Sequence, residues 1–253
     1  MNVPGRKLSP GDLFTLGNGI LGFIAITYIL DGRGAMASVF ILFAMVFDGL
    51  DGYVARRWGS KHSIGPLLDS FSDLISFGIA PSALIYFDFY MLTDKYSLQS
   101  VLALIAAVAF FILAAVRLAW FTMHAHSLPN FSGIPTPAAT FITLMIIFMF
   151  GSKGILLQNP LLVLVCCIAI SILMVSPVPY PKMRGLLLEA ITVVGICFAL
   201  ISMLLYEFVK GYLTLMNVSA IVALALLVLY VCASPFYADR LSGDVKEKGD
   251  EKA

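Results

Sequence analysis

Long apolar segments are the feature that most restricts how this chain can fold. A helix that crosses the hydrocarbon core of a membrane needs about 20 consecutive apolar residues. The chain has 253 residues, of which 60% are hydrophobic and 12% are charged, and the apolar residues gather in segments separated by short polar links. This composition indicates a polytopic integral membrane protein rather than a soluble domain. Because backbone polar groups inside a bilayer must be satisfied within the segment, the expected fold is all-α.

About eight transmembrane helices follow from the spacing of the apolar segments and of the Gly and Pro residues between them. The expected helices are Leu13–Leu30, Ala35–Arg56, Gly65–Phe87, Leu98–Thr122, Pro137–Phe150, Pro160–Val175, Leu186–Phe208 and Leu215–Pro235. The fifth and sixth are short, so we expect them to be tilted, extended by neighbouring residues or surrounded by thinned bilayer. The chain then divides into a cytoplasmic segment at 1–12, one membrane domain at 13–238 and a disordered, charged tail at 239–253.

The basic residues are divided unevenly between the two sides of the membrane. With a cytoplasmic N-terminus, 12 of the 16 Lys and Arg residues fall on the cytoplasmic side, and four fall on the other side: Arg33, Lys95, Lys153 and Lys210. Because positive residues concentrate in cytoplasmic loops, we expect both termini in the cytoplasm of a multi-pass protein of the cell membrane. The sequence has no basic stripe that would indicate nucleic-acid binding. Its four cysteines lie in apolar runs without a C-x-x-C, which argues against a disulfide or metal framework.

Four aspartates interrupt the second and third expected helices. Asp48 and Asp51 lie about 60° apart around a helix axis, and Asp69 and Asp73 about 40° apart, so each pair shares one face. The polar link at 57–63 turns the third expected helix back antiparallel to the second, so the two pairs face each other. Ionisable groups at membrane depth are costly unless paired or metal-bound, and they mark a functional site. Carboxylate oxygens in this number suit divalent Mg, Mn or Ca.

The spacing around these aspartates resembles a family signature. The pattern D-x2-D-G-x2-A-R-x8-G-x3-D-x3-D is complete from Asp48 to Asp73, and it resembles the signature of the CDP-alcohol phosphotransferases. Four further segments resemble the phosphatidylserine synthase branch of that family: Ser76–Pro81, Arg117–Ala119, Phe131–Ala139 and Val175–Pro181. The resemblance covers roughly Pro10 to Pro181. One departure is Pro10-Gly-Asp12, which stands where the family pattern has Pro-Asn.

The resemblance implies an enzyme that moves a phosphatidyl-type group from a CDP-linked lipid, CDP-diacylglycerol or CDP-archaeol, to the hydroxyl of L-serine and releases CMP. It implies two divalent metal ions, Mg or Mn, with Asp48, Asp51, Asp69 and Asp73 as ligands and Asp73 also as the general base. The active site would face the cytoplasm, and the protein would be a homodimer. Because the fixed positions of the motif include no Cys, Ser or His, a direct single displacement is the simpler mechanism.

Two further sets of residues are expected to bind the substrates. The CDP-linked lipid would contact Gly52, Ala55, Arg56 and Gly65: the small residues let the nucleotide approach the backbone, and the guanidinium can donate to a phosphate oxygen. The acceptor would contact Arg117, Ser132 and Thr136. Each set has a simpler explanation. The arginines could snorkel to the membrane surface, Gly65 could serve helix packing, and the two hydroxyls could cap a helix.

Three other functions fit parts of the pattern. The same chemistry could use glycerol phosphate, inositol phosphate or another alcohol, although such phosphates would need several basic residues and the loop after the fourth helix offers mainly Arg117. A membrane prenyltransferase also binds diphosphate through aspartate pairs, but on widely separated helices, whereas both pairs here lie within residues 48–73. A divalent-cation carrier would explain the carboxylates but neither Gly52 nor the Ala55-Arg56 pair.

Overall fold

The computed structural model describes residues 10–58, 65–90, 97–124, 131–150 and 159–180, together with residues 195–197, 199–201, 204 and 225. Within the first five ranges, the secondary structure consists of helices and one pair of two-residue strands. The elements are α1 (Pro10–Leu30), α2 (Gly34–Trp58), α3 (Gly65–Asp73), the π-helix η1 (Leu74–Ile79), α4 (Ala80–Tyr90), α5 (Leu98–His124), β1 (Phe131–Ser132), α6 (Thr136–Phe150), α7 (Pro160–Met174) and β2 (Pro179–Tyr180).

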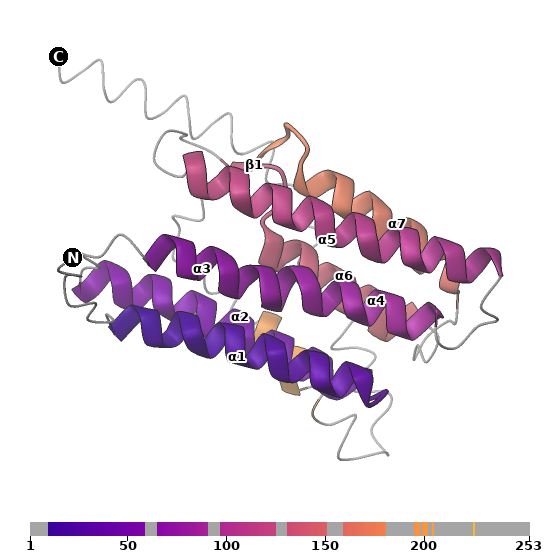
Figure 1. Cartoon of the computed structure of the whole chain (residues 1–253), viewed down its shortest axis with the longest axis horizontal. Helices are drawn as coiled ribbons and strands as arrows, with labels where there is room; N and C mark the ends of the chain where they lie inside the picture. The colour runs from indigo at the N-terminus through magenta and orange to yellow at the C-terminus, as the bar shows by residue number, and fades with distance from the viewer. Residues whose placement is uncertain are drawn as a thin grey trace, which may run out of the picture.

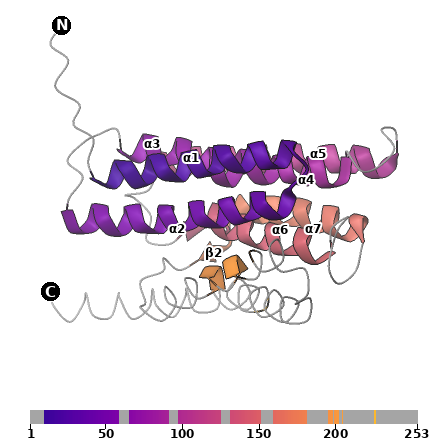
Figure 2. The ribbon, with the colours of Figure 1, turned by 90° about the horizontal axis from the view of Figure 1, so that it is seen from below.

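The long helices run side by side along the longest axis of the molecule (Figure 1). Seen from below, they form two layers, with α1, α3, α4 and α5 in one layer and α2, α6 and α7 in the other (Figure 2). Helix α1 packs against both α2 and α3, and α5 packs against α4 and α7. Helix α1 therefore contacts both helices that carry the aspartates.

The described helices agree with the first six that the apolar pattern predicts. Four are long and apolar enough to cross a membrane: Pro10–Leu30, Gly34–Asp51, Gly65–Phe89 and Leu98–Met123. The fifth and sixth expected helices are present as the apolar helices α6 and α7, of 15 residues each. Of the last two expected helices, at 186–208 and 215–235, only residues 195–197, 199–201, 204 and 225 are described, and these are helical. The N-terminal segment up to residue 9 and the tail at 239–253 lie outside the described residues.

The third expected helix contains a turn that hydropathy does not predict. Elements α3, η1 and α4 follow one another without a break, and η1 is a π-helix that begins directly after Asp73. Thr140 Oγ1, from α6, donates a hydrogen bond of 2.9 Å to the Phe77 carbonyl within this turn. Single π turns inside α-helices are found frequently at functional sites, because they change the direction of the side chains that follow.

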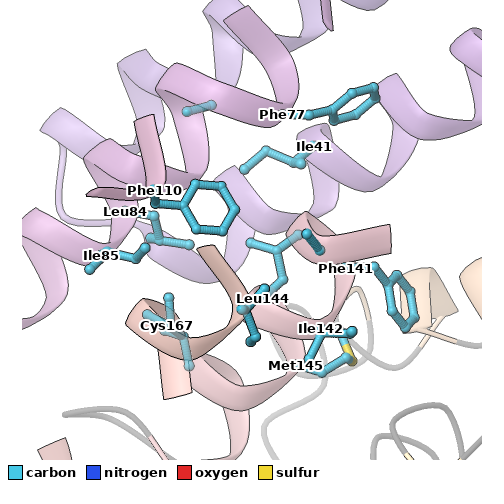
Figure 3. Packing of buried hydrophobic residues seen from close by; sticks show 14 of the residues in the cluster. Ile41, Phe77, Leu84, Ile85, Phe110, Phe141, Ile142, Leu144, Met145 and Cys167 are labelled. Atoms are coloured by element: carbon cyan, nitrogen blue, oxygen red, sulfur yellow. The ribbon is translucent and has the colours of Figure 1, made fainter. Parts of the chain in front are cut away.

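The hydrophobic core lies between the two layers. Its buried side chains come from every long helix, and Figure 3 shows Phe110 of α5 beside Leu84 of α4 in this cluster. Large apolar side chains also cover the outside of the molecule; Phe23 of α1, for example, is 63% exposed. Since lipid is as apolar as the core, helix association in a membrane depends on close packing and on polar contacts rather than on hydrophobic burial alone.

The two strands join loops that are far apart in sequence. Phe131 pairs with Tyr180 and Ser132 with Pro179 in an antiparallel ladder. The next residue, Gly133, has φ +75°, and a Cβ there would lie 2.7 Å from the carbonyl carbon of Met174. Only glycine fits such a position without strain. The loop before α6 is thus held against the end of α7, which joins two of the segments that resemble the phosphatidylserine synthase branch.

Candidate active site

Three of the four aspartates form a compact group. Asp48 and Asp51, near the end of α2, and Asp69, in α3, each offer a carboxylate oxygen, and these atoms all lie within 4.8 Å of one another. Asp51 is buried and the other two are partly buried. The two helices therefore direct their acids at a common point, as the motif spacing predicts.

This group suits a divalent metal ion. Three carboxylates held this close repel one another unless a cation lies between them. Asp69 Oδ1 is buried and has no hydrogen-bond partner among the described residues, so a lone pair remains for a ligand. Carboxylate oxygens are the donors that hard cations such as Mg²⁺ and Mn²⁺ prefer. Asp48, Asp51 and Asp69 thus have the composition and the geometry of a metal site.

Asp73 lies one turn beyond Asp69, next to these three residues but not among those whose carboxylate oxygens all lie within 4.8 Å of one another. Its carboxylate is 8% exposed and interacts electrostatically with Asp48 and Asp69. Asn18 of α1 donates a hydrogen bond of 2.9 Å from Nδ2 to Asp73 Oδ1. Asp73 is therefore close to the group of Asp48, Asp51 and Asp69. A neutral amide holds one of its carboxylate oxygens, which leaves the other oxygen for a different partner.

Helix α1 contributes side chains that the sequence analysis did not single out. Thr15 Oγ1 donates a hydrogen bond of 2.8 Å to Asp51 Oδ2, and Asn18 contacts Asp73 as described above. The buried face of α1 consists of small and polar residues followed by two apolar ones: Gly11, Asp12, Thr15, Asn18, Gly22, Ala25 and Ile29. Polar residues that recur every three or four positions in an otherwise apolar helix were the signal that could have revealed this face.

The fourth expected helix, α5, provides a buried arginine near Asp73. Arg117 Nη1 donates a hydrogen bond of 2.7 Å to Thr136 Oγ1, at the start of α6. The guanidinium carbon lies 5.8 Å from the centre of the Phe121 ring. Arg117 also interacts electrostatically with Asp73, and its Nε has no hydrogen-bond partner among the described residues. Because Arg117 is only 8% exposed, it is a buried group of the bundle rather than a snorkelling side chain.

The remaining expected site residues are described only in part. Gly52, Ala55 and Arg56 lie in helix α2, but the surroundings of these three residues lie outside what the structure describes. Ser132 is part of β1, and its side chain is likewise outside the description. Gly65 is the first residue of α3 and is partly buried. The structure thus brings together the four aspartates, Arg117 and Thr136, and the expected lipid-binding residues stay a prediction.

A carboxylate group that could hold a metal ion, a further buried carboxylate and a buried guanidinium are the parts that phosphoryl-type transfer needs. Such reactions require neutralisation of a diphosphate, a base near the attacking hydroxyl and groups that position the acceptor. All three parts lie in helices apolar enough to cross a membrane. The arrangement is suited to a substrate with an apolar tail and an anionic head.

Comparison with known proteins gives a family match and several relatives. The sequence profile of the CDP-alcohol phosphatidyltransferase family matches residues 9–175. The CDP-diacylglycerol–serine O-phosphatidyltransferase of Methanocaldococcus jannaschii is 34% identical over 196 residues, which cover 78% of this chain and 85% of that protein. The archaetidylserine synthase of Methanothermobacter thermautotrophicus is 32% identical over 180 residues, covering 69% of this chain and 70% of the relative.

A bacterial relative gives the same result. The CDP-diacylglycerol–serine O-phosphatidyltransferase of Bacillus subtilis is 32% identical over 172 residues, covering 68% of this chain and 89% of that protein. The matched region of the family profile contains α1 to α7 with all four aspartates and Arg117.

Proposed function

The chain belongs to the CDP-alcohol phosphatidyltransferase family, and on this premise we propose that it transfers a phosphatidyl-type group from a CDP-linked lipid to the hydroxyl of L-serine, releasing CMP. The single observation that carries this proposal is the partly buried acidic group of Asp48, Asp51 and Asp69 with Asp73 beside it. The names of the three relatives specify serine as the acceptor or as part of the product. The enzyme belongs to phospholipid biosynthesis.

The acidic group would hold the metal. Asp48, Asp51 and Asp69 would bind divalent ions, Mg or Mn and two in number, with Asp73 as a further ligand. When bound, such ions neutralise the diphosphate and stabilise the departing CMP. The carboxylates themselves keep the ions at the cytoplasmic ends of α2 and α3, where a nucleotide can reach them while its lipid tails stay in the bilayer.

Asp73 would act as the general base. Its carboxylate is oriented by Asn18, and a positioned carboxylate can accept the proton of the serine hydroxyl as that oxygen attacks phosphorus. A carboxylate is a weak base towards an alcohol, so positioning must supply much of the rate enhancement. One displacement then breaks the bond from phosphorus to the CMP oxygen and forms the bond to the serine oxygen.

The acceptor would bind between Asp73 and Arg117. The guanidinium can pair with the serine carboxylate through its free Nε, while Nη1 is held by Thr136. Ser132, in the loop that β1 and β2 hold in place, would supply a further hydroxyl. Arg117 is the cation described beside Asp73, which favours serine over glycerol phosphate or inositol phosphate. Gly52, Ala55, Arg56 and Gly65 would contact the CDP moiety.

The setting of the enzyme follows from its helices. A single membrane domain at 13–238, with both termini and the active site on the cytoplasmic side of the cell membrane, agrees with the distribution of basic residues. Four helices long enough to cross a membrane support a multi-pass protein. A homodimer is expected from the family resemblance.

Purified protein in detergent or nanodiscs tests the proposed function. CDP-diacylglycerol or CDP-archaeol, labelled serine and Mg²⁺ or Mn²⁺ should give labelled lipid and an equal amount of CMP. Labelled glycerol phosphate and inositol phosphate, tested in parallel, should give neither product. If CMP release does not depend on serine, or is faster with either phosphate, the acceptor assignment is wrong.

A further inference from the structure

Asn18 has a buried side-chain amide, and the proposed reaction uses only its nitrogen, which orients Asp73. Its side chain is fully buried, and Nδ2 donates to Asp73 Oδ1 at 2.9 Å. The backbone carbonyl of the same residue accepts a hydrogen bond of 2.8 Å from Ser76 Oγ. A buried amide oxygen without a partner is costly in an apolar surrounding, so each atom of this side chain needs an explanation.

The orientation of the amide is fixed by its neighbour. An ionised carboxylate can only accept hydrogen bonds, so the amide nitrogen must face Asp73 and the amide oxygen must point elsewhere. Asn18 Oδ1 is buried and has no partner among the described residues. An acceptor therefore remains free directly beside the expected base.

Close packing keeps Asn18 in this place. A Cβ on Gly22 would lie 2.7 Å from Ser76 Cα, and a Cβ on Gly19 would lie 3.4 Å from Ser72 Cβ. These contacts bring the backbone of α1 against α3 and η1, the segment that begins directly after Asp73. The amide thus has little freedom to turn away from the carboxylate.

The unused hydrogen-bonding atoms around Asp73 match an amino acid. Asn18 Oδ1 is a free acceptor and Arg117 Nε a free donor among the described residues, and both residues interact with Asp73. A zwitterion with a hydroxyl needs an acceptor for its ammonium group, a donor for its carboxylate and a base for its hydroxyl. A further metal ion at Asn18 fits less well, because Asp73 lies outside the three-carboxylate group and interacts with the cationic Arg117.

We propose that Asn18 belongs to the acceptor site, where its amide nitrogen positions Asp73 and its amide oxygen accepts a hydrogen bond from the ammonium group of serine. This inference rests on the proposed function. It adds to the site a residue from α1, outside the aspartate motif.

Two inhibitors isolate the ammonium contact. L-Alanine keeps the ammonium and carboxylate groups of serine, whereas propionate lacks the ammonium group, and neither has the hydroxyl that reacts. In the wild-type enzyme, L-alanine should therefore compete with serine more tightly than propionate. In Asn18→Ala, inhibition by L-alanine should weaken about tenfold while inhibition by propionate changes less than about threefold. The KM for the CDP-linked lipid should change less than threefold as well.

A second variant separates the two roles of the amide and guards against a folding defect. Asn18→Asp has nearly the same shape and keeps an acceptor for the ammonium group, but it replaces the neutral donor by a second acid, which either repels the ionised Asp73 or shares a proton with it and so weakens it as a base. The ratio of the two inhibition constants should stay within about threefold of wild type, while kcat falls at least about tenfold. Thr27→Ala is the matched control, because it removes a hydroxyl on the exposed side of the same helix. It should leave kcat, the KM for the CDP-linked lipid and both inhibition constants unchanged.

The outcomes distinguish this inference from the function on which it rests. A wild-type enzyme without serine-dependent CMP release overturns the proposed function. With an active wild-type enzyme, the inference is overturned by an Asn18→Ala variant that keeps the wild-type preference for L-alanine over propionate, or by an Asn18→Asp variant that keeps the wild-type kcat.

Discussion

Helix α1 and the pair α2–α3 line the same site with opposite kinds of residue. The pair supplies the charge, with Asp48 and Asp51 from α2 and Asp69 and Asp73 from α3. Helix α1 supplies neutral donors, Thr15 and Asn18, which contact one aspartate in each of the two helices. Four acids at membrane depth can act only if something fixes their orientation without adding charge. The comparison therefore separates the charged residues that we propose to perform the chemistry from the neutral residues that hold them in place.

The largest loss of activity should come from substitutions of the aspartates in α2 and α3. Asp48→Asn, Asp51→Asn and Asp69→Asn each remove a ligand charge from the group whose oxygens lie within 4.8 Å of one another. We expect each to lower metal-dependent CMP release at least roughly a thousandfold. Asp88→Asn, in the continuous helix that contains Asp69 but beyond η1, is the control and should stay near wild type. Retained activity in any of the three would remove that residue from the metal site.

Asp73→Asn should have the next largest effect, and of a different kind. The amide has the shape of the carboxylate but cannot take a proton, so kcat should fall roughly 10²- to 10⁴-fold. Binding of the CDP-linked lipid, measured by equilibrium titration with a non-reacting analogue, should change only a few-fold. An equal loss of lipid binding and of rate would contradict the role of general base.

Substitution of glycine by alanine should affect the two regions in the opposite order. Gly22, in α1, should be sensitive to this change, whereas Gly49, inside the aspartate motif, should tolerate it. A Cβ on Gly22 would meet Ser76 Cα at 2.7 Å, whereas a Cβ on Gly49 meets no described atom within 4 Å. Gly22→Ala should lower the free energy of unfolding by about 1–3 kcal/mol, and Gly49→Ala should be neutral or slightly stabilising in a helix.

Thermal unfolding in detergent, followed by helical circular dichroism, measures this difference. Replacing Ser76 by Gly in the Gly22→Ala variant should recover part of the lost Tm, because it removes the side chain that the new Cβ meets. Equal Tm values for Gly22→Ala and Gly49→Ala would show that α1 does not need close contact with η1.

The smallest expected effect belongs to Thr15→Val. This change keeps the shape and removes the hydroxyl that donates to Asp51 Oδ2 at 2.8 Å. Residues that orient metal ligands commonly contribute about 10- to 100-fold to metal affinity, so the Mg²⁺ or Mn²⁺ concentration for half-maximal activity should rise about tenfold while kcat at saturating metal changes little. Thr27→Val, on the exposed side of α1, should leave the metal dependence unchanged; a shift as large as that of Thr15→Val would assign the effect to general damage of the helix.

The sequence was sufficient for the features that depend on composition and on charge. Apolar length predicted six described helices, with α1 beginning at Pro10 instead of Leu13 and α6 and α7 short as expected. Helical periodicity and the short polar link predicted that two pairs of aspartates would face each other, and Asp48, Asp51 and Asp69 form one close group with Asp73 next to it. The length of an apolar segment and the spacing of charged residues around a helix can both be read directly from a single sequence.

Features that depend on packing between distant segments could not be predicted in the same way. The π turn after Asp73 is accompanied by a hydrogen bond from Thr140, 63 positions beyond Phe77. The pairing of β1 with β2 joins residues almost fifty positions apart. Asn18 and Thr15 carry no charge, and in a linear reading they are only two polar residues in an apolar helix. Their roles become visible once α1 is placed against α2 and α3.

Direct measurement of metal binding tests the central claim that these acids hold a cation for the lipid diphosphate. Mn²⁺ bound to the purified protein in the presence of CDP-linked lipid can be counted by electron paramagnetic resonance. The account predicts bound Mn²⁺ in the wild-type protein and its loss in the variant combining Asp48→Asn, Asp51→Asn and Asp69→Asn. Equal Mn²⁺ binding by the two proteins, or serine-dependent CMP release that persists in a strong chelator, would contradict it.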